Sequence, residues 1–215
     1  MLQNFVIVGI TGVGKTFLEL ELQQKQGFYA WPKYTDREDL RQEEQGAPNL
    51  VKVSKTDFQS MLSDFVFTMK YLNNNYGWRR QDYAQNRDKN ITLAMTLENL
   101  ANFMVKVPGF MPIMLHVELN NFGLIENRVR RREGFENLTP EQQRFVNEKV
   151  QERLISARYD LERFSFYQNI VNKYGGKIFV IKDNNTIYEE VIPFILSNKE
   201  KRNKQSVMSI ANKYR

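Results

Sequence analysis

The chain contains no cysteine and only one histidine, His116, among its 215 residues. Without cysteine it can form neither a disulfide nor a thiolate metal site. A single histidine leaves almost nothing from which to build a zinc site or a Ser-His-Asp triad. His116 alternates with apolar residues, and we interpret it as a structural residue. These absences point to chemistry that uses lysine, arginine, hydroxyl groups and carboxylates.

Long apolar runs are also missing. No stretch approaches the ~20 apolar residues that span a membrane. Lys15 and Thr16 interrupt the only early apolar run, so no signal peptide is expected. We therefore expect a protein of the cytoplasm, either of a cell or of a host cell if the gene is viral, without membrane contact.

The composition that remains is ordinary for a globular protein, with 41% hydrophobic and 26% charged residues. The length suits one domain with a full core, or one core that carries inserted subdomains. The net charge of +6 is concentrated at the C-terminus, where residues 198–215 hold six Lys or Arg against one Glu, which leaves only +1 for the rest. This basic tail is typical of a solvated helix end, and contact with nucleic acid is the alternative.

Apolar runs and helical patterns alternate along the chain. Strands are expected at Phe5–Val8, Phe28–Tyr34, Leu50–Val53, Ile91–Thr96, Phe110–Leu119 and Lys177–Ile181. Helices are expected at Lys15–Gln26, Thr56–Ser63, Leu97–Val107, Asn121–Arg132, Pro140–Val171 and Thr186–Ser197. Pro32 predicts an edge position for the second strand, Phe65–Leu72 alternates imperfectly before the turn-rich NNNYGW, and Thr186 with Glu189 forms a capping-box pattern. The alternation predicts an α/β fold with a largely parallel sheet.

The stretch GITGVGKT, residues 9–16, follows the first expected strand and opens the first expected helix. This is the context in which G-x-x-x-x-G-K-[ST] forms a P-loop. The glycines let backbone N–H groups surround phosphates, and the helix N-terminus adds its positive dipole end. The predicted nucleotide-binding residues are Gly9, Thr11, Gly12, Val13, Gly14, Lys15 and Thr16. Lys15 is expected to reach the β/γ-phosphates of ATP, and the Thr16 hydroxyl to ligate Mg²⁺.

The segments that follow resemble the guanylate kinase family in their order. KYTDREDLRQEE (33–44), VSKTDFQSMLSDF (53–65) and NNNYGW (73–78) resemble that family's acceptor-binding segments. The later NRVRRREG and NEKVQERLISARYDLE resemble its lid, and VIKDNNTIYEEVI (180–192) resembles its final strand and helix. The resemblance covers about residues 3–197. It implies a three-layer α/β/α P-loop fold with a mostly parallel five-stranded sheet.

The same resemblance implies a division of the chain. A single domain at 1–197 would have its core at 1–34, 91–125 and 156–197, an acceptor-binding insert at 35–90 and an arginine-rich helical lid at 126–155, with the basic tail at 198–215. Arg37, Arg41, Glu44 and Tyr76 match the family's acceptor-binding residues, with one residue inserted before Arg41. Arg132 and Arg153 match its two lid arginines, which with Lys15 are the expected catalytic residues. Arginine suits these roles because its planar, permanently charged head binds phosphate in a bidentate manner.

Several family positions carry other residues here. The guanine-reading carboxylate falls near Phe67 or Thr68, and a paired-acid motif falls near Ala94 and Thr96. The second acceptor tyrosine falls near Leu50, and the serine after Tyr-Gly is Trp78. An apolar residue cannot replace a carboxylate as the partner of guanine's ring N–H and amino group. We therefore expect an acceptor other than GMP. It would be either another nucleoside monophosphate, stacked on Tyr71, Tyr76 or Trp78, or a sugar phosphate, as in the similar ribose 1,5-bisphosphate phosphokinases.

Alternatives remain open at this stage. Glu98 or Glu118 could orient Mg²⁺-bound water in place of the missing acids, or each could be an ordinary helix-start or loop residue. The basic run Arg128–Arg132 could be a solvated helix face, but we expect at least one of its members to bind phosphate. The leading hypothesis is an ATP-dependent phosphotransferase that acts on a small phosphorylated acceptor. Its rivals are a guanylate-kinase-like binding module with lost catalysis and a kinase directed at nucleic acid.

Overall fold

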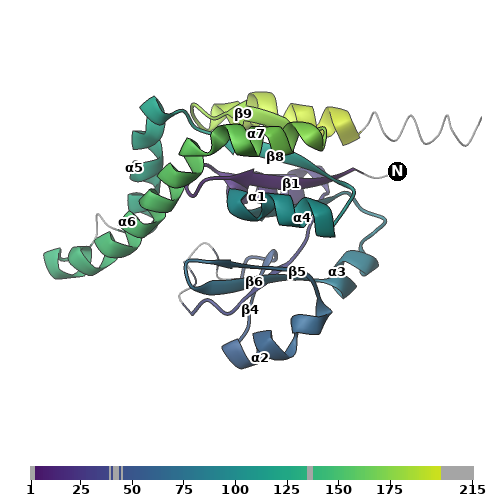
Figure 1. Cartoon of the computed structure of the whole chain (residues 1–215), viewed down its shortest axis with the longest axis horizontal. Helices are drawn as coiled ribbons and strands as arrows, with labels where there is room; N and C mark the ends of the chain where they lie inside the picture. The colour runs from purple at the N-terminus through teal and green to yellow at the C-terminus, as the bar shows by residue number, and fades with distance from the viewer. Residues whose placement is uncertain (1–2, 39, 41–43, 45, 135–137, 200–215) are drawn as a thin grey trace, which may run out of the picture.

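A computed structural model describes residues 3–38, 40, 44, 46–134 and 138–199 of the chain. Two sheets organise this part of the molecule (Figure 1). The larger sheet consists of β1 (Asn4–Gly9), β2 (Tyr29–Ala30), β7 (Ile91–Met95), β8 (Phe110–His116) and β9 (Lys177–Val180). The smaller sheet consists of β3 (Lys33–Thr35), β4 (Leu50–Lys52), β5 (Phe65–Tyr71) and β6 (Asn74–Arg79).

The larger sheet has the strand order β2-β7-β1-β8-β9, and every neighbouring pair is parallel. Every residue of the interior strand β7 is buried, as is nearly all of the central strand β1. A parallel strand that is buried on both faces needs helices on both sides of its sheet. The expected three-layer α/β/α architecture with a parallel five-stranded sheet is therefore confirmed.

Helices cover the faces of the larger sheet, and further helices lie beyond the carboxyl ends of its strands (Figure 1). They are α1 (Lys15–Gln26), α4 (Leu100–Lys106), α5 (Phe122–Arg132), α6 (Pro140–Glu162), α7 (Phe164–Lys173) and a C-terminal helix at 185–199 that contains a π-helical segment, Ile187–Val191. In Figure 1, α5 and α6 project from one end of the larger sheet. α1 contacts the C-terminal helix through the edge-to-face rings of Phe17 and Tyr188, and α4 contacts α7.

The smaller sheet has the order β4-β3-β6-β5 and lies beside the larger one (Figure 1). It carries α2 (Lys55–Ser60) and is followed by α3 (Arg80–Gln85). The indole N–H of Trp31, at the junction of the two sheets, donates to the Arg79 carbonyl over 3.1 Å. The ring of Phe67 in β5 packs edge-on against Phe103 of α4. The two sheets therefore share one apolar core.

The prediction of one strand at Phe28–Tyr34 is wrong. The segment forms two short strands, β2 and β3, that belong to different sheets. Pro32 lies between them and cannot donate a ladder hydrogen bond, so the chain leaves the larger sheet there. The edge position expected for this segment is confirmed for β2, which lies at the end of the larger sheet.

The stretch NNNYGW begins in the expected turn, at Asn73, but continues as a strand from Asn74. Tyr71 pairs with Asn74, which leaves a two-residue hairpin loop of Leu72 and Asn73. Both loop residues have positive φ, 44° and 63°, which is the backbone of the tight turns that match strand twist. The rest of the asparagine-rich sequence continues as β6.

Two helix predictions also need correction. The helix expected at Pro140–Val171 is divided at Arg163 into α6 and α7, without a Gly or Pro to mark the division. Thr186 and Glu189 form no capping box, because the Asp183 carboxylate accepts the Thr186 N–H over 3.0 Å and serves as the cap instead. The capping box that does form joins Thr139 and Gln142 at the start of α6.

Among the described residues, no helix has the length and apolar character needed to cross a bilayer. The predicted basic tail falls on residues 198–215, of which 200–215 lie outside the described residues.

Candidate functional site

The loop between β1 and α1 is shaped by its glycines. A Cβ on Gly9 would lie 2.4 Å from the Leu115 carbonyl oxygen, so no other residue fits beside β8. Gly14 has φ +110° and immediately precedes α1, a backbone conformation that L side chains rarely adopt. The glycines therefore allow a tight loop between β1 and α1. Such a loop at a helix N-terminus can offer its backbone N–H groups to an anion.

Lys15 is folded back over this loop. Its ammonium donates to the carbonyl oxygens of Gly9 and Ile10, each over 2.7 Å. The Lys15 ammonium therefore lies against the loop, and its side chain lines the cavity described below. Thr16, the next residue of α1, lies on the wall of the cavity described below.

A cavity of about 440 Å³ opens from this loop. Ten of the predicted site residues line it: Thr11, Gly12, Gly14, Lys15, Thr16, Arg37, Glu44, Tyr76, Arg132 and Arg153. Gly9 and Val13 do not line it; Val13 is fully buried in the core. Arg41 lies outside the described residues. Residues that are far apart in the sequence therefore meet around one hollow.

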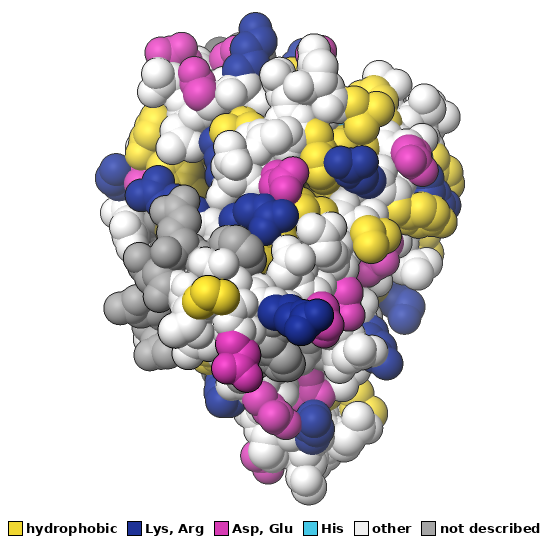
Figure 2. Space-filling view, turned by 90° about the vertical axis from the view of Figure 1, so that its left-hand side faces the viewer, with side chains coloured by type: hydrophobic (Ala, Val, Ile, Leu, Met, Phe, Trp, Pro, Cys, Tyr) yellow, Lys and Arg dark blue, Asp and Glu magenta, His cyan; other side chains and the backbone are white. Residues whose placement is uncertain are grey.

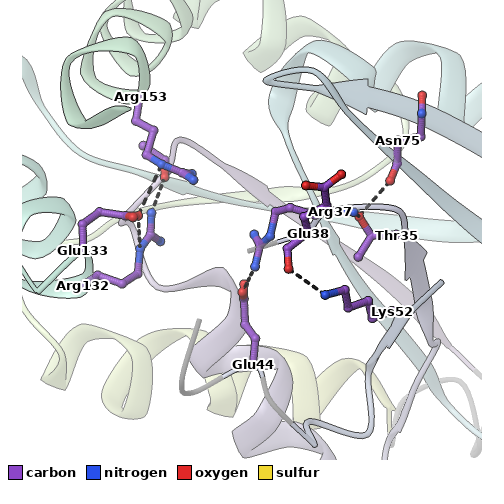
Figure 3. A network of polar contacts seen from close by, with 10 residues as sticks. Thr35, Arg37, Glu38, Glu44, Lys52, Asn75, Arg132, Glu133 and Arg153 are labelled. Carbon is purple, nitrogen blue, oxygen red and sulfur yellow. Dashed lines mark hydrogen bonds and ion pairs between the residues drawn. The ribbon is translucent and has the colours of Figure 1, made fainter. Parts of the chain in front are cut away.

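Arg37 is held on the side of this cavity nearest the smaller sheet by the loop that follows β3. It is only 9% exposed and forms an ion pair with Glu44 (Figure 3). Its backbone N–H donates to the Thr35 hydroxyl over 3.2 Å, and that hydroxyl donates to the Asn75 carbonyl over 2.9 Å. The buried Nε of Arg37 has no hydrogen-bond acceptor among the described residues. A buried guanidinium with an unfilled donor is suited to an anionic ligand.

Arg132 and Arg153 converge on one carboxylate across the cavity from Arg37. Glu133 Oε1 lies 3.8 Å from Arg132 Nε and 3.4 Å from Arg153 Nε (Figure 3). Arg132 also donates from Nη2 to the Thr11 hydroxyl over 3.1 Å. Glu133 therefore holds Arg132 of α5 close to Arg153 of α6, and Arg132 also contacts the phosphate loop.

Arg128 is a third arginine at this place, and sequence reasoning singled out only the run to which it belongs. It lines the cavity, and it donates to the Gly12 carbonyl over 3.3 Å and to Asn184 Oδ1 over 2.9 Å. Burial lowers the pKa of its guanidinium, and nearby Asp183 opposes that effect. Its spacing of four residues from Arg132 is the signal, since residues i and i+4 share one face of a helix.

The side of the cavity nearest the smaller sheet carries several apolar and aromatic side chains. Leu50, Met69, Tyr71 and Tyr76 contribute to its wall, together with the ammonium-bearing Lys33. Neither position expected for the guanine-reading residue faces the cavity: Phe67 is buried against Trp78 and Phe103, and Thr68 is exposed.

Trp78 is wrongly predicted as a stacking platform for a base. It is fully buried in the core and does not line the cavity. β6 directs this side chain toward Phe67, whereas Tyr76, two residues earlier, lies on the cavity wall.

Glu19 is a buried acid that sequence reasoning missed. It lies one helical turn after Lys15 in α1 and is 3% exposed. Asn49 donates to its carboxylate over 2.5 Å. Burial raises the pKa of Glu19 to about 7, against the opposing effects of Lys33, Asn49 and the backbone at Ala94. An acid among the inward-facing residues of the first helix is the signal that could have identified it.

Acidic groups lie near the phosphate loop, although the strand positions Ala94 and Thr96 carry none. Asp160 of α6 interacts electrostatically with both Lys15 and Glu98, and burial raises its pKa. The Tyr167 hydroxyl donates to its carboxylate over 3.0 Å. Glu98 lies in a short 3₁₀ turn, Leu97–Asn99, directly after β7.

Thr16 and its surroundings fit a magnesium ion that is bound mainly by nucleotide phosphates and water. Mg²⁺ commonly takes only one or two protein ligands in such sites. The described part of the chain holds no cluster of three acidic or histidine side chains that would bind a metal by itself. A hydroxyl at the first turn of α1, on the cavity wall, meets the limited requirement of a nucleotide-bound ion.

No protein-family model matches the chain, and no curated protein matches it. Among solved structures, it is similar to guanylate kinase from Anaplasma phagocytophilum, with 14% identity, a TM-score of 0.59, and coverage of 92% of this chain and 87% of that one. It also matches tRNA isopentenylpyrophosphate transferase from Bacillus halodurans (12% identity, TM-score 0.43, coverage 96% and 99%). A gluconokinase from Sinorhizobium meliloti 1021 matches as well (14% identity, TM-score 0.30, coverage 76% and 96%).

Only the first of these likenesses bears on the fold, since the other two have TM-scores below 0.5. At 14% identity it shows shared architecture and nothing about substrate. The chain therefore shares the architecture of that guanylate kinase, and its glycine-rich loop and arginines from three separate segments face one cavity.

Proposed function

We propose that the protein is an ATP-dependent kinase that transfers the γ-phosphoryl group to a small phosphorylated acceptor, a nucleoside monophosphate. One observation carries this proposal. Among the described residues, six basic side chains and only one acid line the cavity at the phosphate loop: Lys15, Lys33, Arg37, Arg128, Arg132 and Arg153, with Glu44 as the acid. Such a concentration of positive charge suits two phosphorylated ligands bound side by side.

ATP would bind at residues 9–16. The backbone N–H groups of the loop and the N-terminus of α1 would hold its phosphates. Lys15 would exchange the Gly9 and Ile10 carbonyls, on which it now rests, for the β/γ-phosphates. Thr16 would ligate Mg²⁺, whose chemical contribution is to neutralise charge on the phosphate oxygens.

The acceptor would bind over the smaller sheet. Arg37 offers its buried guanidinium to the acceptor's phosphate, and Glu44 fixes the orientation of that guanidinium. Arg41, which lies outside the described residues, would add a second cation for this phosphate. Tyr76, on the cavity wall, would contact the acceptor beside this phosphate. A planar base fits between the apolar side chains that surround Tyr76.

The transfer itself would be direct, with no covalent enzyme intermediate. Positioning and charge neutralisation supply most of the catalysis in phosphoryl transfer. Arg132 and Arg153 would leave Glu133 for the transferring phosphoryl group, while Arg128 would bind the phosphates from its place over Gly12. We further propose that residues 35–90 act as an acceptor-binding insert and residues 126–155 as a lid that brings these arginines to the reacting group.

A turnover assay tests the proposal. Purified protein would be incubated with Mg-ATP and each of AMP, CMP, GMP, UMP, dTMP and ribose phosphates, and ADP release would be measured. The proposal expects release that depends on one of the nucleotides. Nucleotide binding without turnover on any acceptor would instead support a binding module. Turnover only on oligonucleotide ends would support a kinase directed at nucleic acid, with the basic tail as its anchor.

A further inference from the structure

Lys33 occupies a fixed place on the acceptor side of the cavity. It is the first residue of β3, where it pairs with Leu50 on one side and Trp78 on the other. Its backbone N–H donates to the Asn49 carbonyl over 3.0 Å. The side chain lines the cavity, with its ammonium 5.8 Å from the centroid of the Tyr76 ring. β3 therefore presents a cation beside an aromatic wall.

A buried carboxyl lies behind this cation. Glu19 interacts electrostatically with Lys33, and Asn49 orients the same carboxyl through a hydrogen bond of 2.5 Å. Asn49 thus contacts both residues, through its carbonyl to Lys33 and through its amide to Glu19. Because Glu19 belongs to α1 and Asn49 precedes β4, this contact joins the phosphate-loop helix to the acceptor side.

Among the described residues, six basic side chains and a single acid line the cavity that Lys33 faces, so charged donors outnumber charged acceptors there. Glu44 is the one acid on the cavity wall among the described residues, and it forms an ion pair with Arg37. Met69 and Leu50 are apolar, and Tyr71 and Tyr76 contribute ring surface. A ligand that places amino groups here would leave them without a charged partner, whereas keto oxygens would meet the Lys33 ammonium.

The nucleobases differ in how many hydrogen-bond donors and keto oxygens they carry. Guanine, adenine and cytosine each carry an exocyclic amino group with two donors, and guanine adds a ring N–H. Uracil and thymine carry two keto oxygens and a single ring N–H. We propose that Lys33 is a specificity-determining residue that selects a uracil or thymine nucleotide as the acceptor, an inference that rests on the proposed kinase function.

Substitution of Lys33 tests whether this residue selects the base of the acceptor. For the wild type we expect kcat/KM for UMP or dTMP to exceed that for CMP, AMP and GMP by about 10-fold or more. Lys33→Met should lower kcat/KM for the keto pyrimidines by about 10- to 100-fold, the cost of one charged hydrogen bond, and change that for AMP, whose base has no keto oxygen, little. Lys33→Met combined with Glu19→Gln avoids leaving a buried carboxyl without its counter-charge, and should show the same loss of selectivity.

Thio-substituted acceptors probe the contact at one atom. Sulfur accepts hydrogen bonds weakly, so 2-thio-UMP or 4-thio-UMP should be poorer than UMP for the wild type. The two forms should become equivalent in Lys33→Met, since the variant makes no bond to the keto group. If neither analogue differs from UMP in the wild type, Lys33 does not read a keto oxygen.

Other outcomes separate this inference from the kinase proposal. An equal loss for every nucleotide in Lys33→Met would place Lys33 at the shared phosphate and overturn the assignment. A loss of ATP affinity, measured by calorimetry, would place it on the nucleotide side and overturn it as well. If the wild type transfers phosphate to no acceptor, the kinase proposal fails. Calorimetric binding of UMP and CMP to wild type and Lys33→Met then still decides whether Lys33 confers the preference.

Discussion

Arg132 and Thr11 are separated by 121 positions in the sequence, yet Arg132 Nη2 donates to the Thr11 hydroxyl over 3.1 Å. This hydrogen bond connects the end of α5 to the phosphate loop. Its geometry makes α5 part of the candidate site, and it underlies the first prediction.

Arg132→Ala should lower kcat for phosphoryl transfer by at least about 100-fold, because it removes a cation from the transferring group. Steady-state kinetics with the preferred acceptor measure the effect. Arg131→Ala is the matched control, since Arg131 is the exposed neighbour on the same helix and does not line the cavity. Equal losses in the two variants would contradict a direct role for Arg132.

Lys15→Ala should weaken ATP binding or abolish transfer. Each charged hydrogen bond to phosphate that is lost costs about 1.5–3 kcal/mol, or about 10-fold or more in affinity. Calorimetry with ATP and ADP, together with turnover, checks this. Lys25→Ala provides the comparison, because Lys25 lies on the same helix but pairs with Glu21 on the surface. If the wild type binds neither nucleotide at millimolar concentration, residues 9–16 are not a nucleotide site.

Arg37→Ala should raise the acceptor KM or lower kcat/KM by about 10- to 150-fold while leaving ATP affinity nearly unchanged. The reason is that Arg37 lies at the smaller sheet, where its guanidinium pairs with Glu44. Lys55→Ala, which removes an exposed cation of the same half of the molecule, should have no effect. A parallel loss of ATP binding in Arg37→Ala would assign this arginine to the nucleotide instead.

GMP should be a poor acceptor, because no cavity-lining carboxylate other than Glu44 is found in the described residues. The missing charged partner costs about 1.5–3 kcal/mol for guanine. Met69 lines the cavity from β5, so Met69→Glu should raise kcat/KM for GMP relative to the other nucleotides. A wild-type kcat/KM for GMP above that for AMP, CMP, UMP, dTMP and ribose phosphates would refute the prediction.

Glu19 should make the stability of the fold depend on pH. Its pKa is about 7 in the folded protein against 4.5 for an ordinary glutamate, so the folded state holds the proton more tightly and unfolding releases it. The free energy of unfolding should therefore fall as the pH rises from about 4.5 to about 7, by up to about 3 kcal/mol.

Glu19→Gln isolates this effect, because the amide can still accept the hydrogen bond from Asn49. Denaturant unfolding should find the variant close to the wild type at pH 5 and more stable than it at pH 8. A wild type that is the more stable protein at pH 8 would mean that the pKa of Glu19 is not raised and that Lys33 stabilises its carboxylate. The comparison between proteins cancels the contributions of Asp160 and His116, whose pKa values are raised and lowered, respectively, by burial.

Local sequence alone determined the elements that depend on neighbouring residues. The phosphate loop follows from glycine positions, β1 from a continuous apolar run, and the bounds Lys15–Gln26 of α1 from Gly14 and Gly27, which both adopt left-handed backbone at its ends. The alternation of strands and helices was sufficient to predict a parallel α/β sheet, because a parallel connection requires a crossover helix.

Tertiary structure alone decided the assignments that depend on distant partners. The side-chain period of two places Phe67 and Met69 on the same, buried face of β5 and leaves Thr68 exposed. Only the packing of β5 against α4 makes Phe67 part of the core, while Met69 lies on the cavity wall. The charges of Glu19 and Lys33 are read easily from the sequence, but their meeting requires Asn49 to join two segments of the chain. Burial then raises the pKa of Glu19, a property that exists only once α1 and the smaller sheet enclose it.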